Sequence, residues 1–419
     1  MRSAIKTGSL LLAVVMLFSA IFAAGCSFSP EWSYKTSEKQ LPIGVYIYAL
    51  RAAYGEAETK AKELEDYDST KDSWLDMEIE IHDGEKGVAR DLIKKEAEEN
   101  CLKYLAVENE LKNLSATPDS AQLDTSREQS KTYWEVGPYA QYGQISPMKN
   151  ELEKYGVSYD SFAYATADYS VNYSTLFAAL YAEGGTQAVS DSELTKFVEE
   201  NYADYSYFSV PLYKSDSTDT TTGQATSTAL SDEEKKKITD ELTGYVNSIN
   251  DGKAYADVVE EYMKANNVTE NPSKDNVEHK DDFSAGDEVK AAYDKLQTGK
   301  ASLVTVGQDT TATLYVVYKK DIKADAAKQV ADNRASVLSK MKTDDFDAYI
   351  KQLVEKLEYE KSPAVDKYDP KMFFVAVQPT TAADAGSSDS DSSAAESSDT
   401  DSSAAESSNS ESSAESKAE

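Results

Sequence analysis

Few residues of this sequence could carry out acid–base or nucleophilic chemistry. The chain of 419 residues has two histidines, His82 and His279, and two cysteines, Cys26 and Cys101. It contains no HExxH or GxSxG motif, and no histidine stands near a candidate nucleophile. We therefore expect no metal site and no cofactor. Cys101 falls inside a helical pattern, and the lack of a histidine partner favours a buried structural cysteine over a catalytic thiol.

Cys26 ends a pattern that is typical of lipidation signals. A basic start and the apolar residues 10–24 lead into the small residues at 23–25 and then into Cys26. This pattern resembles a lipobox, so we expect residues 1–25 to be a signal peptide that is removed. Acyl chains on Cys26 would hold the protein on the outer face of a bacterial cell membrane. An ordinary secretory signal followed by a coincidental cysteine is the alternative.

The charge of the chain excludes several kinds of partner. The formal net charge is −32, from 43 basic and 75 acidic residues. Such a surface repels nucleic acids, so we expect no nucleic-acid binding. Residues 378–419 consist mainly of serine, alanine and acidic residues, with no large apolar side chain to bury. We predict a disordered, solvated tail there, and a calcium-binding or glycosylated tail is the alternative.

The folded part of the chain divides into segments with different sequence patterns. Residues 26–40 read as a tether, and residues 41–202 carry apolar side chains at steps of three and four, which predicts a helical lobe. A capping box, Ser190 with Glu193, predicts the start of its last helix.

The sequence pattern changes near residue 203, where strand-like runs begin to alternate with helices. The strand-like run DYSYFSVPLY, a polar loop and a second capping box, Ser231 with Glu234, are followed by helices and by two more strand-like runs at 302–306 and 312–318. Residues 203–321 therefore predict a small domain with an antiparallel sheet. Residues 322–377 return to a long helix that packs on the first lobe. The fold class that we predict is α+β, mostly helical, with the small sheet domain between two helical pieces.

Several phrases of the sequence resemble one family. These phrases are YGVSYDSFAYATADYSVNYSTLFAAL, INDGKAYADVVEEY, DEVKAAYDKLQTGKASLVTV and LEYEKSPAVDKYDPKMF. Together with the lipobox and the order of the elements, they resemble the PrsA-like extracytoplasmic foldase lipoproteins, relatives of the periplasmic chaperone SurA. The resemblance covers the mature chain except for its tail. It implies a helical chaperone lobe, a parvulin-type peptidyl-prolyl isomerase domain at 203–321, and unfolded secreted polypeptides as partners. It leaves a homodimer open.

The parvulin active site does not transfer to this chain. Active members of that family share two histidines, which meet across the sheet beside a prolyl pocket. The corresponding positions here are Tyr207, Phe208 or Ser209 for the first-strand histidine, the neighbourhood of Tyr315 for the last-strand histidine, and the neighbourhood of Val289 for a pocket phenylalanine. His279 lies in a polar stretch and is expected to be solvated. We therefore assign no catalytic residue and expect weak or absent isomerase activity, with a Tyr207–Tyr315 replacement site as the alternative.

The sequence favours a binding function over a catalytic one. The chain has 28 tyrosines and 11 phenylalanines, and tyrosine suits half-exposed surfaces that grip varied peptides. Most of these tyrosines are expected to be packing residues, and a subset is a candidate client-binding cradle: Tyr164, Tyr169, Tyr173 and Tyr181. The alternatives are a lipid-anchored solute- or glycan-binding lipoprotein, which is usually built on parallel sheets, and a surface adhesin that displays its tail.

Overall fold

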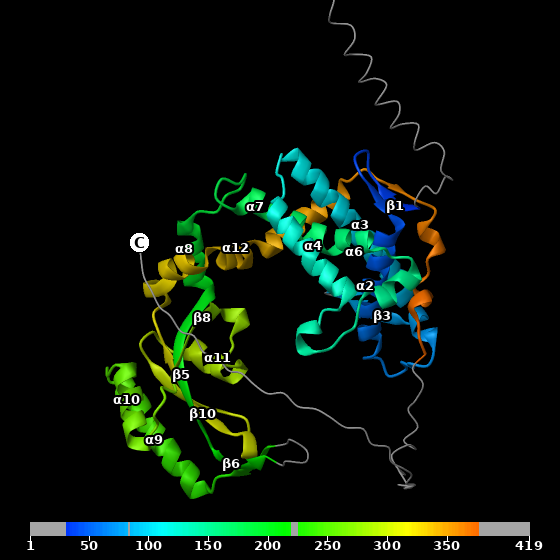
Figure 1. The fold of residues 1–419 in the computed structure, drawn as a ribbon. Coiled ribbons are helices and arrows are strands. Elements are labelled where there is room, and N and C mark those ends of the chain that lie inside the picture. Colours follow the sequence, from blue (N-terminus) through cyan, green and yellow to red (C-terminus); the bar gives the residue numbers. More distant parts are fainter. Residues whose placement is uncertain (1–30, 83, 219–224, 377–419) are drawn as a thin grey trace, which may run out of the picture.

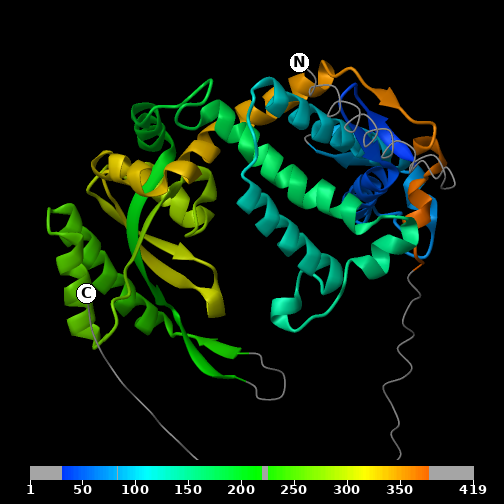
Figure 2. The same cartoon turned by 45° about the horizontal axis from the view of Figure 1, so that its top comes forward.

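The protein has a helical lobe and a smaller part built on an antiparallel sheet (Figures 1 and 2). The computed structural model describes residues 31–82, 84–218 and 225–376. Cys26, the expected signal peptide and the expected tail lie outside these ranges. The predicted fold class, α+β with a small antiparallel sheet, is confirmed. No helix within the described ranges has the length and apolar character needed to cross a bilayer.

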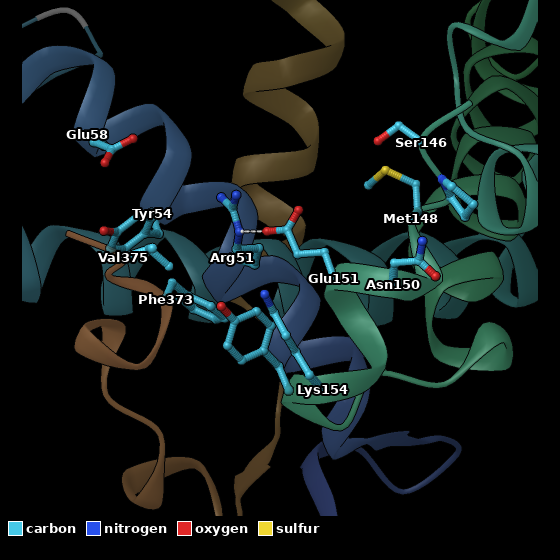
Figure 3. Close-up of a pocket in the computed structure, with 12 residues that line it drawn as sticks. Arg51, Tyr54, Glu58, Ser146, Met148, Asn150, Glu151, Lys154, Phe373 and Val375 are labelled. Carbon is cyan, nitrogen blue, oxygen red and sulfur yellow. Dashed lines mark hydrogen bonds and ion pairs between the residues drawn. The ribbon is translucent and has the colours of Figure 1, made fainter. Parts of the chain in front are cut away.

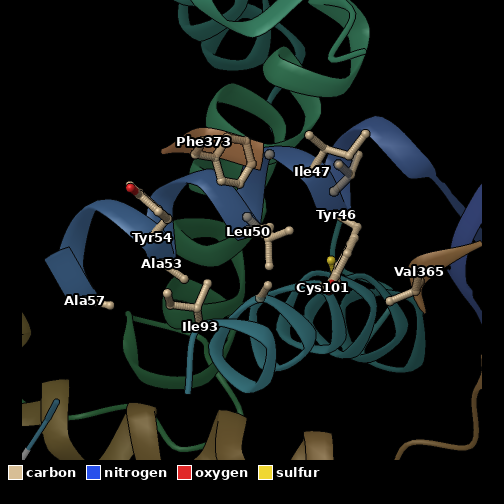
Figure 4. Packing of buried hydrophobic residues seen from close by; sticks show 14 of the residues in the cluster. Tyr46, Ile47, Leu50, Ala53, Tyr54, Ala57, Ile93, Cys101, Val365 and Phe373 are labelled. Carbon is tan, nitrogen blue, oxygen red and sulfur yellow. The ribbon is translucent and has the colours of Figure 1, made fainter. Parts of the chain in front are cut away.

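The helical lobe is built around two long helices that pack side by side. Its helices are α2 (Ile43–Ala61), α3 (Ala89–Asn113), α4 (Ser120–Glu135), α5 (Lys149–Leu152), α6 (Tyr159–Ala163), α7 (Tyr169–Tyr181) and α8 (Asp191–Asn201), with a π-helical turn at Tyr164–Asp168 between α6 and α7 and short 3-10 turns at Asp72–Asp76, Ala140–Tyr142 and Glu153–Tyr155. Figure 4 shows Leu50 and Ala53 of α2 packed against Ile93 and Cys101 of α3. The predicted capping box at the start of α8 is present: Glu193 N donates to Ser190 Oγ, and the Glu193 carboxylate accepts from Ser190 N.

The stretch expected to be a tether is folded from residue 31 onward. Strand β1 (Trp32–Lys35) pairs with β2 (Gln40–Pro42) on one side and with the short β11 (Glu360–Lys361) on the other. The prediction of a tether to residue 40 is wrong in this part, because Tyr34 is fully buried against Tyr46 and the C-terminal segment covers it. A second hairpin, β3 (Glu78–Ile81) and β4 (Glu85–Val88), also interrupts the predicted helical run.

The small part is a four-stranded antiparallel sheet with helices on both faces. Its strand order is β8 (Lys274–His279), β5 (Tyr202–Pro211), β10 (Thr313–Lys319) and β9 (Ala301–Val306). Helices α9 (Asp232–Asn250) and α10 (Tyr255–Asn266) cover one face, and α11 (Asp287–Lys295) lies on the face that is turned towards the helical lobe (Figures 1 and 2). The second predicted capping box, Ser231 with Glu234, begins α9.

The polar stretches of the small part hold strands that the sequence analysis does not predict. β8 is an edge strand whose residues are all exposed or half-buried, so it carries few apolar residues. The predicted polar loop after Tyr213 forms a hairpin, β6 (Tyr213–Thr218) with β7 (Ala225–Ala229). Periodicity of apolar residues cannot detect either segment, because neither contributes much to the core.

Helix α12 (Ile322–Glu355) joins the two parts of the molecule. It packs on α8 and α3 through a shared cluster in which Phe346 and Val337 are fully buried. Its backbone departs from helical geometry at Asn333. After α12 the chain adds β11 and two 3-10 turns, Val365–Lys367 and Pro370–Phe373, and places Phe373 in the core of the helical lobe (Figure 4).

Candidate binding surfaces

The register of β5 separates the three residues at which a first-strand histidine was expected. Tyr207 and Ser209 point to the face that carries α11, whereas Phe208 points to the opposite face. Phe208 is fully buried against Tyr262, with ring centroids 4.9 Å apart. Only Tyr207 and Ser209 can therefore belong to a site on the α11 face.

A row of aromatic rings lies on this face of the sheet. Ser209 pairs with Tyr315 of β10, and Tyr315 pairs on its other side with Val304 of β9. The Tyr207 and Tyr315 rings are 5.6 Å apart, and both side chains are half-buried. Half-exposed rings that are fixed by a sheet can bind apolar groups at a low entropic cost.

Phe283, which the sequence analysis does not single out, extends the row. Its ring stacks on Tyr205 with centroids 4.3 Å apart, and Tyr205 in turn lies 6.0 Å from Tyr207. The Tyr205 hydroxyl donates to the Glu278 carboxylate, which also accepts from Ser284 N at 2.8 Å. Burial, together with the hydrogen bond to the carboxylate, raises the pKa of Tyr205 to about 12, so this phenol stays protonated at neutral pH. The sequence signal for Phe283 is weak, because it stands alone in a polar stretch.

Both histidines lie away from this face. The prediction that His279 is solvated in a loop is wrong: it is the last residue of β8, and its side chain is only 13% exposed. Its ring stacks on Phe197 of α8 and meets the edge of Tyr202. Burial lowers the pKa of His279. His82 lies in the helical lobe after β3. Its Nδ1 is 3.4 Å from Glu56 Oε1, and its Nε2 is 3.6 Å from Glu96 Oε2. No imidazole therefore meets another across the sheet.

The other candidates for chemistry are packing residues. Val289 of α11 is fully buried against the sheet, together with Tyr293 and Val317. Cys101 is fully buried in α3, and burial raises the pKa of its thiol. Within the described ranges, no group of three or more acidic, histidine or cysteine side chains is placed to hold a metal ion.

The four tyrosines of the candidate cradle lie between helices. Tyr181 is buried, and Tyr169 packs on Tyr104 of α3 at 4.5 Å. The Tyr173 ring lies 4.7 Å from Phe346 of α12, and its hydroxyl donates to Asp347. The Tyr164 hydroxyl is buried. This placement favours the packing alternative for all four rings.

The helical lobe carries an open groove that the sequence analysis does not foresee. It has a volume of about 450 Å³, and its lining includes Tyr54, Met148, Tyr155, Phe373 and Val375. Figure 3 shows Met148 on one wall, Phe373 and Val375 on the other, and the Arg51–Glu151 ion pair between them. A signal exists in the sequence: residues 136–148, which lead into the groove, carry no charge although 28% of the chain is charged.

Comparison with known proteins gives matches among solved structures. No protein-family model matches the chain, and no curated protein matches it by sequence. The crystal structure of PrsA from Bacillus subtilis matches at a TM-score of 0.20 and 14% identity, over 68% of this chain and 94% of that chain. The structure of foldase protein PrsA from Streptococcus pneumoniae str. Canada MDR_19A matches at a TM-score of 0.27 and 12% identity, over 69% of this chain and 96% of that chain. These identities and TM-scores are too low to assign this chain a family or a function.

Proposed function

We propose that this protein is an extracytoplasmic chaperone that binds unfolded segments of secreted polypeptides and assists their folding without catalysing prolyl isomerisation. The observation that carries the proposal is the aromatic face of the small sheet. Tyr207 and Tyr315 stand half-buried beside each other on that face, Phe283 extends the row through the buried Tyr205, and both imidazoles of the chain lie elsewhere. Such a face can hold apolar side chains, but it presents no imidazole for acid–base work.

The expected lipid anchor at Cys26 would place this binding at the membrane surface. Polypeptides leave the export machinery unfolded at the outer face of the cell membrane, and an acylated protein is concentrated there. We further propose residues 41–202 with 322–377 as the helical lobe of the chaperone and residues 203–321 as the unit that presents the aromatic face. A homodimer stays a prediction.

The solute-receptor alternative finds less support in the geometry. Every strand pairing in the described ranges is antiparallel. Solute receptors are usually built from parallel βαβ units, with the ligand enclosed between two such lobes. The rings of this protein instead lie on one face of an antiparallel sheet.

Removing the two central rings is expected to weaken polypeptide binding. The double variant Tyr207→Ala, Tyr315→Ala should raise the Kd for reduced, carboxymethylated lactalbumin about thirtyfold, because two aromatic contacts of about 1 kcal/mol each are lost. Fluorescence anisotropy of the labelled lactalbumin measures the Kd. The matched control is Tyr359→Ala, which removes an exposed ring of the helical lobe. Equal Kd values for the double variant and the wild type would remove the aromatic face from the proposal.

Prolyl isomerisation of a proline-containing tetrapeptide is expected to proceed at its uncatalysed rate. The barrier of about 18–20 kcal/mol arises from amide resonance, and this face has no pair of imidazoles to support the parvulin arrangement. A protease-coupled assay at a protein concentration of several micromolar measures the rate. Turnover that Tyr207→Phe or Tyr315→Phe abolishes would instead identify a tyrosine-based isomerase site.

A further inference from the structure

The loop at residues 136–148 is built to hold apolar side chains outward. Ser146 N donates to Val136 O at 2.9 Å, and Met148 N donates to Tyr133 O at 3.2 Å, so the two ends of the loop are joined. Gly137 has a φ of +108°, and a Cβ there would lie 2.3 Å from Ser146 O, so only glycine allows this close approach. The exposed fractions at the tip reach 73% for Tyr142 and 75% for Ile145.

The exposed apolar side chains gather at the groove of the helical lobe. The structure exposes five large hydrophobic side chains in its described ranges: Tyr139, Tyr142, Ile145, Tyr359 and Val375. The first three belong to the loop that enters the groove at Ser146, and Val375 lines the groove itself. Exposed apolar side chains that are concentrated around one concave surface indicate a binding site rather than chance exposure.

The cations of the groove differ in whether they form an ion pair with a described residue. Arg51 Nε lies 2.6 Å from Glu151 Oε1, and Glu58 pairs with Lys62 at 3.0 Å, so these charges are compensated. Lys154 has no ion pair within the described ranges, and its Nζ lies 4.9 Å from the centroid of the adjacent Tyr155 ring. The site therefore suits a ligand that combines apolar groups with a carboxylate.

The chain's own continuation has this chemistry and starts at the groove. Phe373 and Val375 form one wall (Figure 3). The residues that follow are apolar or uncharged from Val377 to Ala383, and the first carboxylate is Asp384, followed by Asp389 and Asp391. We propose that residues 377–391 fold back along the groove, with Val377 and Pro379 beside the rings and the loop tip, and with carboxylates near Lys154.

The tether makes this contact favourable even when its intrinsic affinity is low. Asp384 lies nine positions after Val375 in the sequence, and a flexible linker of nine residues spans about 15–18 Å on average. Its effective concentration at the groove is about 1 mM or higher. At about 1 mM, a contact with a Kd of about 0.1 mM as a free peptide is about nine-tenths formed in the intact chain, and one with a Kd of about 1 mM is about half formed. The segment covers the apolar surface and competes with any polypeptide that would enter the groove.

Methyl NMR of the intact chain tests the contact. Ile145 and Met148 report from the loop and the groove, whereas the buried Ile249 and Ile350 report on the small sheet core and on the α12 core. Ending the chain at Ala376 should shift the Ile145 and Met148 resonances and leave those of Ile249 and Ile350 unchanged. Titrating the truncated chain with a peptide of residues 377–391 should return both resonances towards their positions in the full chain.

Charge variants distinguish this site from general electrostatic attraction. Lys154→Glu should weaken binding of the added peptide about three- to fivefold, as expected for one exposed charge contact, and raised salt should also weaken it. Lys131→Glu is the matched control, because Lys131 is an exposed lysine of α4 that does not line the groove.

Three results would overturn the proposal. The Ile145 and Met148 resonances of the full and truncated chains could coincide, which would show that the segment does not reach the groove. The difference between them could grow with protein concentration, which would assign the groove to a second copy of the chain. Lys131→Glu could weaken binding as much as Lys154→Glu, which would leave no specific site. None of these results bears on the aromatic face of the small sheet.

Discussion

Phe208→Ala is expected to destabilise the small sheet part by about 3–5 kcal/mol, the range for an aromatic side chain removed from a core. Phe208 is fully buried and lies between Tyr262 and Tyr255 of α10, whose ring centroids are 4.9 and 6.4 Å from its own. Its neighbour Val316 on β10 is also fully buried. The packed rings cannot collapse into the space that the ring leaves, so both the transfer term and the cavity term apply.

Tyr207→Ala is the matched control one position away on the same strand. Tyr207 lies on the open face and is half-buried, so its loss should cost about 1 kcal/mol, for partial burial and one ring contact. Native-state hydrogen exchange of the β5 and β10 amides measures the local stability of the small part, which matters because a molecule of two parts need not unfold in one step. A larger loss for Tyr207→Ala than for Phe208→Ala would mean that the strand faces are reversed.

This pair shows why the sequence could predict the strand but not the site. The run DYSYFSVPLY is β-prone throughout, and β5 spans Tyr202–Pro211, close to the predicted 204–213. Tyrosine, phenylalanine and serine alternate there without a clear polar side, because α9 and α10 cover one face and α11 and the helical lobe lie on the other. The assignment of Phe208 to the core and of Tyr207 to the open face depends on the register with β10, which lies about a hundred residues away in the sequence.

Local signals gave the most reliable predictions, and long-range packing limited the others. Both capping boxes, at Ser190 and Ser231, depend on residues three apart, and both are present. The prediction of a tether is wrong at Tyr34, because β11, the strand that pairs with this residue, lies more than three hundred residues later in the sequence. The prediction for His279 failed in the same way, because Phe197 of α8 covers its ring.

Lys320→Met is expected to destabilise the connection between the two parts of the molecule. The chain enters the small sheet at Tyr202 and leaves it at Lys319, and Lys320 N donates to Asp204 O at this crossing. Asp204 is fully buried, and Lys320 Nζ lies 3.1 Å from its Oδ1. Within the described ranges, neither carboxylate oxygen accepts a hydrogen bond of good geometry, so the ammonium is the main compensation for the buried charge. Removing one partner of a buried pair costs about 3–5 kcal/mol, and we expect about 2–3 here because Lys320 is partly exposed to water.

The pH dependence of this loss has a definite sign. Burial raises the pKa of the Asp204 carboxyl above its ordinary value of 3.8, although Lys320 opposes the shift. A group whose pKa is raised in the folded state contributes stability below its unfolded pKa, and that contribution is lost as the pH rises through the folded value. Without Lys320 the folded pKa rises further, so the destabilisation by Lys320→Met should be largest at pH 7 and should shrink as the pH falls towards 4. Asp275 and Asp325 also face Lys320 and add to the negative potential at this site.

The double variant Asp204→Asn, Lys320→Met isolates the pair. With the carboxylate replaced by a neutral amide, the loss of the ammonium should cost much less, so the double variant should be more stable than Lys320→Met alone at pH 7. Urea unfolding of the wild type, the single variants and the double variant at pH 7 and pH 4.5 gives the coupling free energy at each pH. Equal destabilisation by Lys320→Met at the two pH values would mean that Asp204 is not ionised in the folded protein. The crossing between the two parts would then be held by backbone contacts rather than by charge.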